Sequence, residues 1–263
     1  MLWSTVNKKY SLSPQPFASG SYGKVYIAQN VHTKKRYAAK VVEKKGVDRW
    51  SGEIECLEIL KDCDSAVSLH DVYQSEYAAV MVMDKMTPFF PSAEEYVVRE
   101  SIREILLALD EIHERGIIHG DVKPANIMKG DDDVCKFIDF GLSIRFFNKD
   151  KPVILQQPCG SPGYASPEVY NKKTSPRSDV WSVGVVAYNF MTGELPFPGS
   201  TSCQVMHRIL YSPPATNRIL DFGYSTHAVN FVLELLTKKP EQRPSVKEAL
   251  AHPWFSTYLP NPC

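Results

Sequence analysis

The sequence predicts an α+β fold with two lobes, a small β-rich lobe followed by a larger, mainly helical lobe. Up to about Met86, most apolar residues fall in short runs of β-branched and aromatic side chains, which is typical of strands. The run Thr87-Pro88-Phe89-Phe90-Pro91 ends this pattern, because proline cannot continue regular backbone pairing. Beyond it, apolar residues recur at helical spacing over longer stretches.

Four strands and one main helix are expected in the small lobe. The strands cover 22–29, 36–42, 67–73 and 78–83. The helix covers 48–60 and places Ile54 and Leu57 at near-helical spacing, with acidic residues on its other faces. Such a helix packs on a sheet by one face.

The large lobe is expected to begin with a long amphipathic helix over 95–115. Its apolar stripe consists of Val98, Ile102, Ile105, Leu106, Leu109 and Ile112. Three further helices are expected over 178–191, 228–236 and 245–250. The junction of the two lobes is expected to form a cleft, the usual place for a small ligand.

Composition limits the class of partner and the compartment. Thirty basic and thirty acidic residues cancel, so no long-range field gathers nucleic acid or anionic lipid. The six cysteines lack metal-ligand spacing, which indicates reduced thiols. The N-terminal stretch MLWSTVNKKY is no signal peptide, and the apolar stretch around 180–190 is too short and polar to span a bilayer. We expect a cytoplasmic monomer, with the nucleus left open, and no nucleic-acid or membrane partner.

A glycine-containing segment, Ala18-Ser19-Gly20-Ser21-Tyr22-Gly23-Lys24-Val25, lies at a strand-to-strand turn. Glycine allows backbone N–H groups to approach phosphate oxygens closely, because no Cβ stands in the way. Taken alone, the segment also fits an ordinary hairpin turn.

A lysine lies inside an apolar strand in the run Tyr37-Ala38-Ala39-Lys40-Val41. A buried ammonium is costly without an anionic partner, so the alternative is a lysine whose head reaches solvent. Glu53, on the next predicted helix and one turn ahead of Leu57, is the expected partner. Glu55 points to a different face of the same helix.

Two acidic motifs in the large lobe occur at a spacing that phosphoryl-transfer enzymes use. Asp121 and Asn126 are five residues apart with Lys123 between them, and Asp139-Phe140-Gly141 begins thirteen residues after Asn126. Each aspartate taken singly is more often a turn or cap residue. The combination at this separation points to chemistry instead.

With these motifs the chain resembles the eukaryotic-type serine/threonine protein kinases, and the resemblance covers nearly its full length. The segment 160–168, GSPGYASPE, is similar to the GTxxYxAPE segment that closes the kinase activation loop, and 179–184, DVWSVG, is similar to the DxWxxG motif. The end, from Arg243-Pro244-Ser245 to 249–255, is most similar to the calcium/calmodulin-dependent kinase group. The resemblance implies one two-lobed protein kinase domain over 1–263, with an N-lobe to about 86 and a C-lobe from 87.

The resemblance implies ATP and Mg²⁺ as cofactors and serine or threonine hydroxyls of proteins as acceptors. Asp121 would accept or orient the proton of the attacking hydroxyl, and Lys123 would neutralise charge on the transferred phosphoryl group. Asn126 and Asp139 would hold the magnesium. A loose transition state needs this alignment and cationic surroundings more than covalent help.

The resemblance also implies the residues that bind ATP. The adenine would lie between Val25 and Ala38 above and Met128 below, along the hinge backbone at 84–86, with Met83 at its rear. Lys40 and Glu53 would fix the α- and β-phosphates. The full implied set is Ala18, Ser19, Gly20, Ser21, Tyr22, Gly23, Val25, Ala38, Lys40, Glu53, Met83, Asp84, Met86 and Met128.

Two structural roles and a substrate preference are implied in the same way. Glu168 with Arg243 would anchor the activation segment, and Asp179 would brace the catalytic loop. Lys123 and its expected neighbour Ser161 follow the serine/threonine-specific pattern. Relatives that prefer arginine before the target often carry glutamate at two places that here hold Ala125 and Asn189, so a weak preference for basic substrates is expected.

Three positions depart from the family pattern. Ala18 replaces the first glycine of the phosphate-binding turn, and Gly120 replaces the arginine before the catalytic aspartate. That arginine typically binds a phosphate on the activation segment, yet the place of the usual phosphothreonine holds Gln157. Both halves of the switch are absent, so activity without activation-loop phosphorylation is expected.

Two alternatives remain open. The first is a pseudokinase that binds nucleotide or partners as a scaffold. The second is a small-molecule phosphotransferase of related fold, because such enzymes often read H-G-D where this chain has His119-Gly120-Asp121. The second alternative is disfavoured by the segment 160–168 and by Arg243. These residues would build a docking surface for a polypeptide, which a small substrate would not require.

Overall fold

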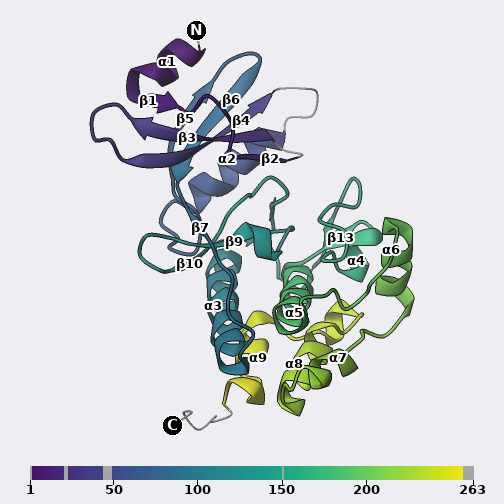
Figure 1. The fold of residues 1–263 in the computed structure, drawn as a ribbon. Helices are drawn as coiled ribbons and strands as arrows, with labels where there is room; N and C mark the ends of the chain where they lie inside the picture. Colours follow the sequence, from purple (N-terminus) through teal and green to yellow (C-terminus); the bar gives the residue numbers. More distant parts are fainter. Residues whose placement is uncertain (1, 21–22, 44–48, 150, 257–263) are drawn as a thin grey trace, which may run out of the picture.

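The structure is a computed structural model that describes residues 2–20, 23–43, 49–149 and 151–256. It has the two lobes that the sequence predicts, a curled antiparallel sheet with helices and a mainly helical region (Figure 1). Ser21 and Tyr22 of the predicted phosphate-binding turn lie outside the described residues.

The small lobe is built on an antiparallel sheet in the order β1-β3-β4-β6-β5, with β2 paired to β3. All four predicted strands are confirmed, with small shifts at their ends. The central strand β6 is buried along nearly its whole length, which explains its continuous apolar sequence. The strands are β1 (Tyr10–Leu12), β2 (Ala18–Gly20), β3 (Gly23–Asn30), β4 (Arg36–Glu43), β5 (Leu69–Gln74) and β6 (Ala78–Asp84).

The predicted helix of the small lobe is α2 (Arg49–Ile59), which buries Ile54 and Leu57 as the periodicity indicates. These two side chains join a core that continues through Val67 and Phe137 into the large lobe. The helix is therefore fixed by packing on one face, while its other face stays available for charged contacts.

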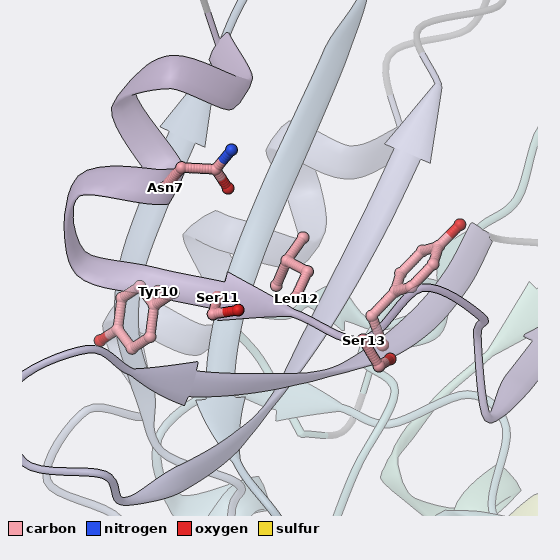
Figure 2. Close-up of a pocket in the computed structure, with 6 residues that line it drawn as sticks. Asn7, Tyr10, Ser11, Leu12 and Ser13 are labelled. Carbon is pink, nitrogen blue, oxygen red and sulfur yellow. The ribbon is translucent and has the colours of Figure 1, made fainter.

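The N-terminal helix α1 (Leu2–Lys9) and strand β1 were not predicted from the sequence. They lie at the end of the small lobe that is far from the helical lobe (Figure 1). Lys9 Nζ and Tyr10 Oη hold them to Asp71 of β5, at 2.7 Å and 2.5 Å from Oδ2. A shallow hollow of about 450 Å³ lies beside α1 and β1 (Figure 2), and is lined by Asn7, Tyr10, Ser11, Leu12, Ser13 and Tyr26.

The proline-containing connection differs from the prediction. Thr87 and Pro88 form a short strand, β7 (Thr87–Pro88), opposite Lys129 and Met128 of β9 (Ile127–Lys129). Proline is tolerated here because β7 is the edge strand of its small sheet, where a missing N–H donor can face away from the ladder. The expectation that the prolines exclude regular pairing was therefore wrong at this position.

The large lobe is organised around α3 (Glu95–Glu114) and α5 (Pro176–Thr192), which pack on each other in one apolar core. Helix α5 starts two residues before the predicted position, because Ser175 caps it and Pro176 occupies its first turn. Gly193 ends it in the left-handed conformation, with φ of +72°. The predicted helices over 228–236 and 245–250 are α8 (Thr226–Leu235) and α9 (Val246–Leu250).

The remaining elements of the large lobe are short. Among the described residues, no helix is both long enough and apolar enough to cross a membrane. The helical elements are η1 (Pro124–Asn126), α4 (Pro167–Tyr170), α6 (Ser202–Tyr211), α7 (Asn217–Asp221), η2 (Pro240–Gln242) and η3 (Pro253–Phe255). The strands are β8 (Ile117–Ile118), β10 (Cys135–Phe137), β11 (Ile144–Arg145), β12 (Val153–Ile154) and β13 (Lys173–Thr174).

Candidate active site

Lys40 lies inside the small-lobe sheet, because β4 pairs with β3 on one side and with β6 on the other. Its Nζ is 2.6 Å and 2.8 Å from the two carboxylate oxygens of Glu53 on α2, the partner that the sequence predicts. Nζ is also 2.7 Å from Oδ1 of Asp139. Burial lowers the pKa of Lys40, but the two carboxylates outweigh it and hold the pKa above its usual value. The ammonium is thus charged where the two lobes meet.

Glu55 points away from this buried pair, also as predicted. Its Oε1 lies 2.6 Å from Nη1 of Arg145 in β11, and both side chains are about half exposed. Helix α2 therefore contacts Lys40 of β4 through its buried carboxylate and the segment after Asp139 through its exposed carboxylate. The Arg145 contact was not predicted, because nothing local in the sequence connects residues that are 90 positions apart.

The loop between β8 and β9, residues 119–126, is held from below by Asp179. This buried carboxylate accepts the backbone N–H groups of His119 and Gly120 at 2.8 Å and 2.9 Å, and lies 2.8 Å from Nε2 of His113. These contacts fit the bracing role that the resemblance implies for Asp179. The backbone of the 119–126 loop is therefore fixed directly before Asp121.

His119 connects this loop to the residue before Asp139, a contact that sequence reasoning missed. The backbone N–H of Asp121 donates to Nδ1 of His119 at 3.2 Å, so Nε2 carries the proton and faces the carbonyl oxygen of Ile138 at 3.1 Å. The imidazole is buried between the rings of Phe137 and Phe140. The spacing of one residue between His119 and Asp121 fits the local bond between them, but no local pattern indicates the contact with Ile138.

Gly120 has a local structural reason to be glycine. Its φ is +77°, in the left-handed region, and a Cβ at this position would lie 2.6 Å from the carbonyl oxygen of Leu142. The backbone of the residue after Asp139-Phe140-Gly141 thus passes directly against the 119–126 loop. A larger residue would need one of these two backbones to move.

Asp121 lies at the centre of a hydrogen-bonded cluster. Lys123 Nζ donates to its Oδ2 at 2.7 Å and also to Ser161 Oγ at 2.7 Å, while the Ser161 backbone N–H donates to Oδ1 at 2.9 Å. Nδ2 of Asn126 donates to the backbone oxygen of Asp121 at 2.9 Å. Burial raises the pKa of Asp121, but the bonds from Lys123 and Ser161 outweigh it and leave the pKa below its usual value.

Asn126 and Asp139 offer the oxygen ligands that a hard divalent cation prefers. The amide nitrogen of Asn126 is engaged with Asp121, which leaves its Oδ1 with no donor among the described residues. One oxygen of Asp139 faces Lys40, and no described residue donates to Oδ2. The backbone N–H of Ile138 donates to the Asn126 carbonyl at 3.0 Å. Asp139, the next residue, is therefore close to Asn126. This donor set fits magnesium.

Three of the residues expected around adenine lie on adjacent strands of the small-lobe sheet, and Met128 lies on β9 of a separate sheet. Ala38 is opposite Met83 in the β4–β6 ladder, and Val25 is opposite Lys40 in the β3–β4 ladder. Met83 is buried, whereas Val25, Ala38 and Met128 are partly exposed. The sheet therefore places Val25 and Ala38 close to Lys40 along the backbone, which is the arrangement a nucleotide base and its phosphates would need.

The predicted phosphate-binding turn is described only at its two ends. Ala18 and Ser19 are exposed on β2, and Gly20 is opposite Gly23 across the turn. Gly23 has φ of +138°, and a Cβ there would lie 2.4 Å from the carbonyl oxygen of Val41. The close approach of β4 thus excludes a side chain at Gly23.

The residues expected to form the hinge lie at the end of β6 and directly after it. Asp84 ends β6 and its Oδ1 lies 2.7 Å from Nε2 of His70. The hydrogen bond to His70 lowers the pKa of Asp84, with burial acting against it. Met86 is partly buried against the main core. A hollow of about 210 Å³ beside the hinge is lined by Lys35, Asp84, Lys85, Met86, Gly130, Asp131, Asp132 and Lys136.

Glu168 and Arg243 form a buried ion pair beneath the site. Nη1 and Nη2 of Arg243 lie 2.7 Å and 3.0 Å from the two carboxylate oxygens of Glu168, and the Arg243 side chain is fully buried. Burial raises the pKa of Glu168, but the bonds from Arg243 and Ser178 leave it below its usual value. The pair ties α4, at the end of the segment that contains Ser161, to the C-terminal part of the lobe.

Comparison with protein families agrees with this geometry, because residues 15–255 match the protein kinase domain. The chain belongs to the protein kinase domain family. The kinase domain therefore covers both lobes and includes every residue of the site described above.

Curated relatives of this kinase domain are about 30% identical to it. It is 32% identical to the mouse hormonally up-regulated neu tumor-associated kinase over 94% of this chain, but spans only 37% of that protein. It is 29% identical to calcium/calmodulin-dependent protein kinase type 1 of Caenorhabditis elegans, over 96% of this chain and 76% of that protein. It is 28% identical to the CBL-interacting serine/threonine-protein kinase 20 of Arabidopsis thaliana, over 94% of this chain and 58% of that protein.

Proposed function

We propose that this kinase domain transfers the γ-phosphoryl group of ATP to serine or threonine hydroxyls of protein substrates. The observation that carries the proposal is the cluster around Asp121. Lys123 and Ser161 keep the pKa of this carboxylate low, so it is ionised at neutral pH and can accept a hydrogen bond from a substrate hydroxyl.

Asp121 would orient the attacking hydroxyl, and Lys123 beside it would offset charge on the group in transfer. Lys40, fixed by Glu53, would hold the phosphates of the nucleotide. When bound at Asn126 and Asp139, magnesium would supply charge neutralisation on those phosphates. The protein contributes alignment, because most of these side chains are buried and hydrogen-bonded in advance.

We further propose that this activity needs no phosphate on the activation segment, which we define as residues 139–168. Gly120 provides no guanidinium that could bind such a phosphate, and Gln157 provides no hydroxyl to carry one. The Ser161 backbone already contacts Asp121 in the unmodified chain, at 2.9 Å. Treatment of the purified protein with a phosphatase should therefore leave its rate of phosphoryl transfer unchanged.

The test compares the purified wild-type domain with Asp121→Asn and Asp139→Asn, using Mg·ATP with labelled γ-phosphate, dephosphorylated casein and a serine/threonine peptide library. Both variants should lose transfer by at least about 100-fold, because each removes a charge that acts on the reacting groups. Nucleotide binding in a thermal-shift assay without transfer by the wild type would favour the scaffold alternative. Transfer to aminoglycosides or choline, but to no polypeptide, would favour the small-molecule enzyme.

A further inference from the structure

The middle of the activation segment contains no residue that a protein kinase could phosphorylate. From 144 to 160 the sequence is IRFFNKDKPVILQQPCG, without serine, threonine or tyrosine. In a segment of this kind, a phosphate bound by arginine often provides order. Other contacts must therefore hold Ser161 against Asp121 here.

Backbone pairing fixes the segment at two places. Near its start, Ile144 is opposite Ile118 in the β11–β8 ladder. In its middle, Val153 is opposite Thr174 in the β12–β13 ladder, and the N–H of Leu155 donates to the carbonyl of Lys172 at 2.8 Å. The described part of the segment therefore has ordered backbone on both sides of 146–152.

The segment and α4 form an apolar cluster of their own, which meets the main core of the large lobe at Tyr170. Its buried members are Leu155, Ala165 and Val169, and Ile144, Cys159 and Tyr170 pack against them. They come from the beginning, middle and end of the segment and from α4. Leu155 is 8% exposed, two residues before Gln157, whereas its neighbour Ile154 is 70% exposed. The buried leucine is thus close in sequence to the place of the usual phosphate.

The cluster is linked to Asp121 by short contacts. A Cβ at Gly160 would lie 3.3 Å from the carbonyl oxygen of Gly120 and 3.4 Å from Cβ of Ala165, so Gly160 fits between the 119–126 loop and the cluster. The next residue, Ser161, accepts the N–H of Ala165 on its carbonyl at 3.2 Å and donates its own N–H to Asp121 at 2.9 Å.

We propose that Leu155 is a positioning residue whose burial takes the place of activation-segment phosphorylation. It closes the apolar cluster, the cluster fixes Ala165 and Gly160, and these hold the Ser161 N–H on the carboxylate of Asp121. The inference rests on the proposed kinase activity. It deepens that proposal by naming an apolar device that keeps the site assembled at all times.

The test uses the phosphatase-treated domain as wild type, Leu155→Ala, Leu155→Met and Ile154→Ala. Steady-state transfer from Mg·ATP to dephosphorylated casein gives kcat and the KM for ATP, and hydrogen exchange reports on the amides of 153–161. Leu155→Ala should lower kcat by about 10- to 100-fold, because a small displacement of Ser161 disturbs Asp121, with the KM for ATP unchanged. Amides of 153–161 should exchange faster in this variant.

Leu155→Met conserves apolar volume and should restore kcat to within about 3-fold of wild type. Ile154→Ala removes an exposed side chain from the same strand and should match the wild type in both measurements. Equal kcat and exchange in Leu155→Ala and Ile154→Ala would overturn the inference, as would a loss of kcat that methionine does not restore. If Leu155→Ala does not fold, Leu155→Val gives the same comparison with a smaller cavity.

Failure of the proposed function gives a different result. A wild type that transfers no phosphoryl group would refute the kinase activity, yet the exchange data would still decide whether Leu155 holds Ser161. Faster exchange at 153–161 in Leu155→Ala alone would support the positioning contact, and unchanged exchange would refute it.

Discussion

The residue before Asp121 is determined by backbone geometry as much as by regulation. Gly120 combines a φ of +77° with the close approach of the Leu142 carbonyl oxygen, at 2.6 Å from any Cβ. The absence of arginine therefore removes a phosphate-binding group and also avoids a contact between a Cβ and the Leu142 carbonyl oxygen. Both consequences follow from one missing side chain.

Gly120→Ala should destabilise the fold more than Gly193→Ala. Gly193 has a nearly equal φ of +72°, but a Cβ added there would meet no atom within 4 Å. Its variant therefore measures the conformational cost alone, about 1 kcal/mol. Gly120→Ala adds the backbone contact with Leu142, for a total loss of about 2 to 3 kcal/mol in the free energy of unfolding. Denaturant titration of both variants gives the two values. Equal losses would show that the Leu142 contact relaxes without cost.

Two glutamates on α2 should differ strongly in their importance for nucleotide binding. Glu53 is 3% exposed and holds Lys40, whereas Glu55 pairs with Arg145 in solvent. Glu53→Gln should lower kcat/KM for ATP by about 10-fold or more, because the buried ammonium loses its partner charge. Glu55→Gln should change it by less than about 2-fold, since an exposed pair contributes little. Similar losses in both variants would contradict the assignment of Glu53 as the functional partner.

Regular elements with a strong pattern could be predicted from the sequence, whereas weakly patterned ones could not. Helix α3 buries a continuous apolar stripe, and its ends agree closely with the predicted range 95–115. Helix α6 buries only Val205 and Ile209, so its periodicity is too sparse to detect. Strand β1 has three residues and is fixed by Asp71, which lies about 60 positions away. Its formation depends on tertiary contacts that no local window contains.

The same division applies to the candidate site. Lys40, Asp121 and Asp139 could be located because their motifs are local in the sequence. The contact of Lys40 with Asp139 spans 99 positions, and the hydrogen bond of His119 to Ile138 depends on how two loops meet. Such contacts follow from packing, which pattern and spacing do not specify.

The element α4 depends on the ion pair of Glu168 with Arg243, and this dependence should vary with pH. The pKa of Glu168 is below its usual value of 4.5 in the folded protein. A carboxylate with a lowered pKa stabilises the fold when ionised, so its contribution is complete above the unfolded value and is lost as the pH falls through the folded value. Glu168→Gln should therefore cost about 3 kcal/mol near neutral pH and clearly less below about pH 4.

The measurement is the free energy of unfolding of wild type and Glu168→Gln from neutral pH to below about pH 4. Glu194→Gln breaks an exposed pair with Arg218 and serves as the control, with almost no change expected at any pH. A difference between wild type and Glu168→Gln that stays constant down to acid pH would mean that the charge of Glu168 does not stabilise the folded state.

Across the whole molecule, one apolar core joins the two lobes. Ile54 and Leu57 of α2 belong to the same buried cluster as Ile105 of α3 and Trp181 of α5. A smaller cluster, which contains Val6 and five other buried residues, lies on the other side of the small-lobe sheet. The small lobe is therefore coupled to the large lobe through α2, the helix that also carries Glu53.

The two lobes should consequently unfold in a single transition. Hydrogen exchange with mass spectrometry, carried out over a urea series, reads peptides from β6 and from α5 separately. Their midpoints should coincide, because exposure of the shared core removes support from both lobes at once. Saturating Mg·ATP should raise both midpoints together, since a ligand that binds only the folded state stabilises it as a unit. A lower midpoint for β6 that ATP alone corrects would mean that the small lobe folds independently and that Glu53 reaches Lys40 only when nucleotide is bound.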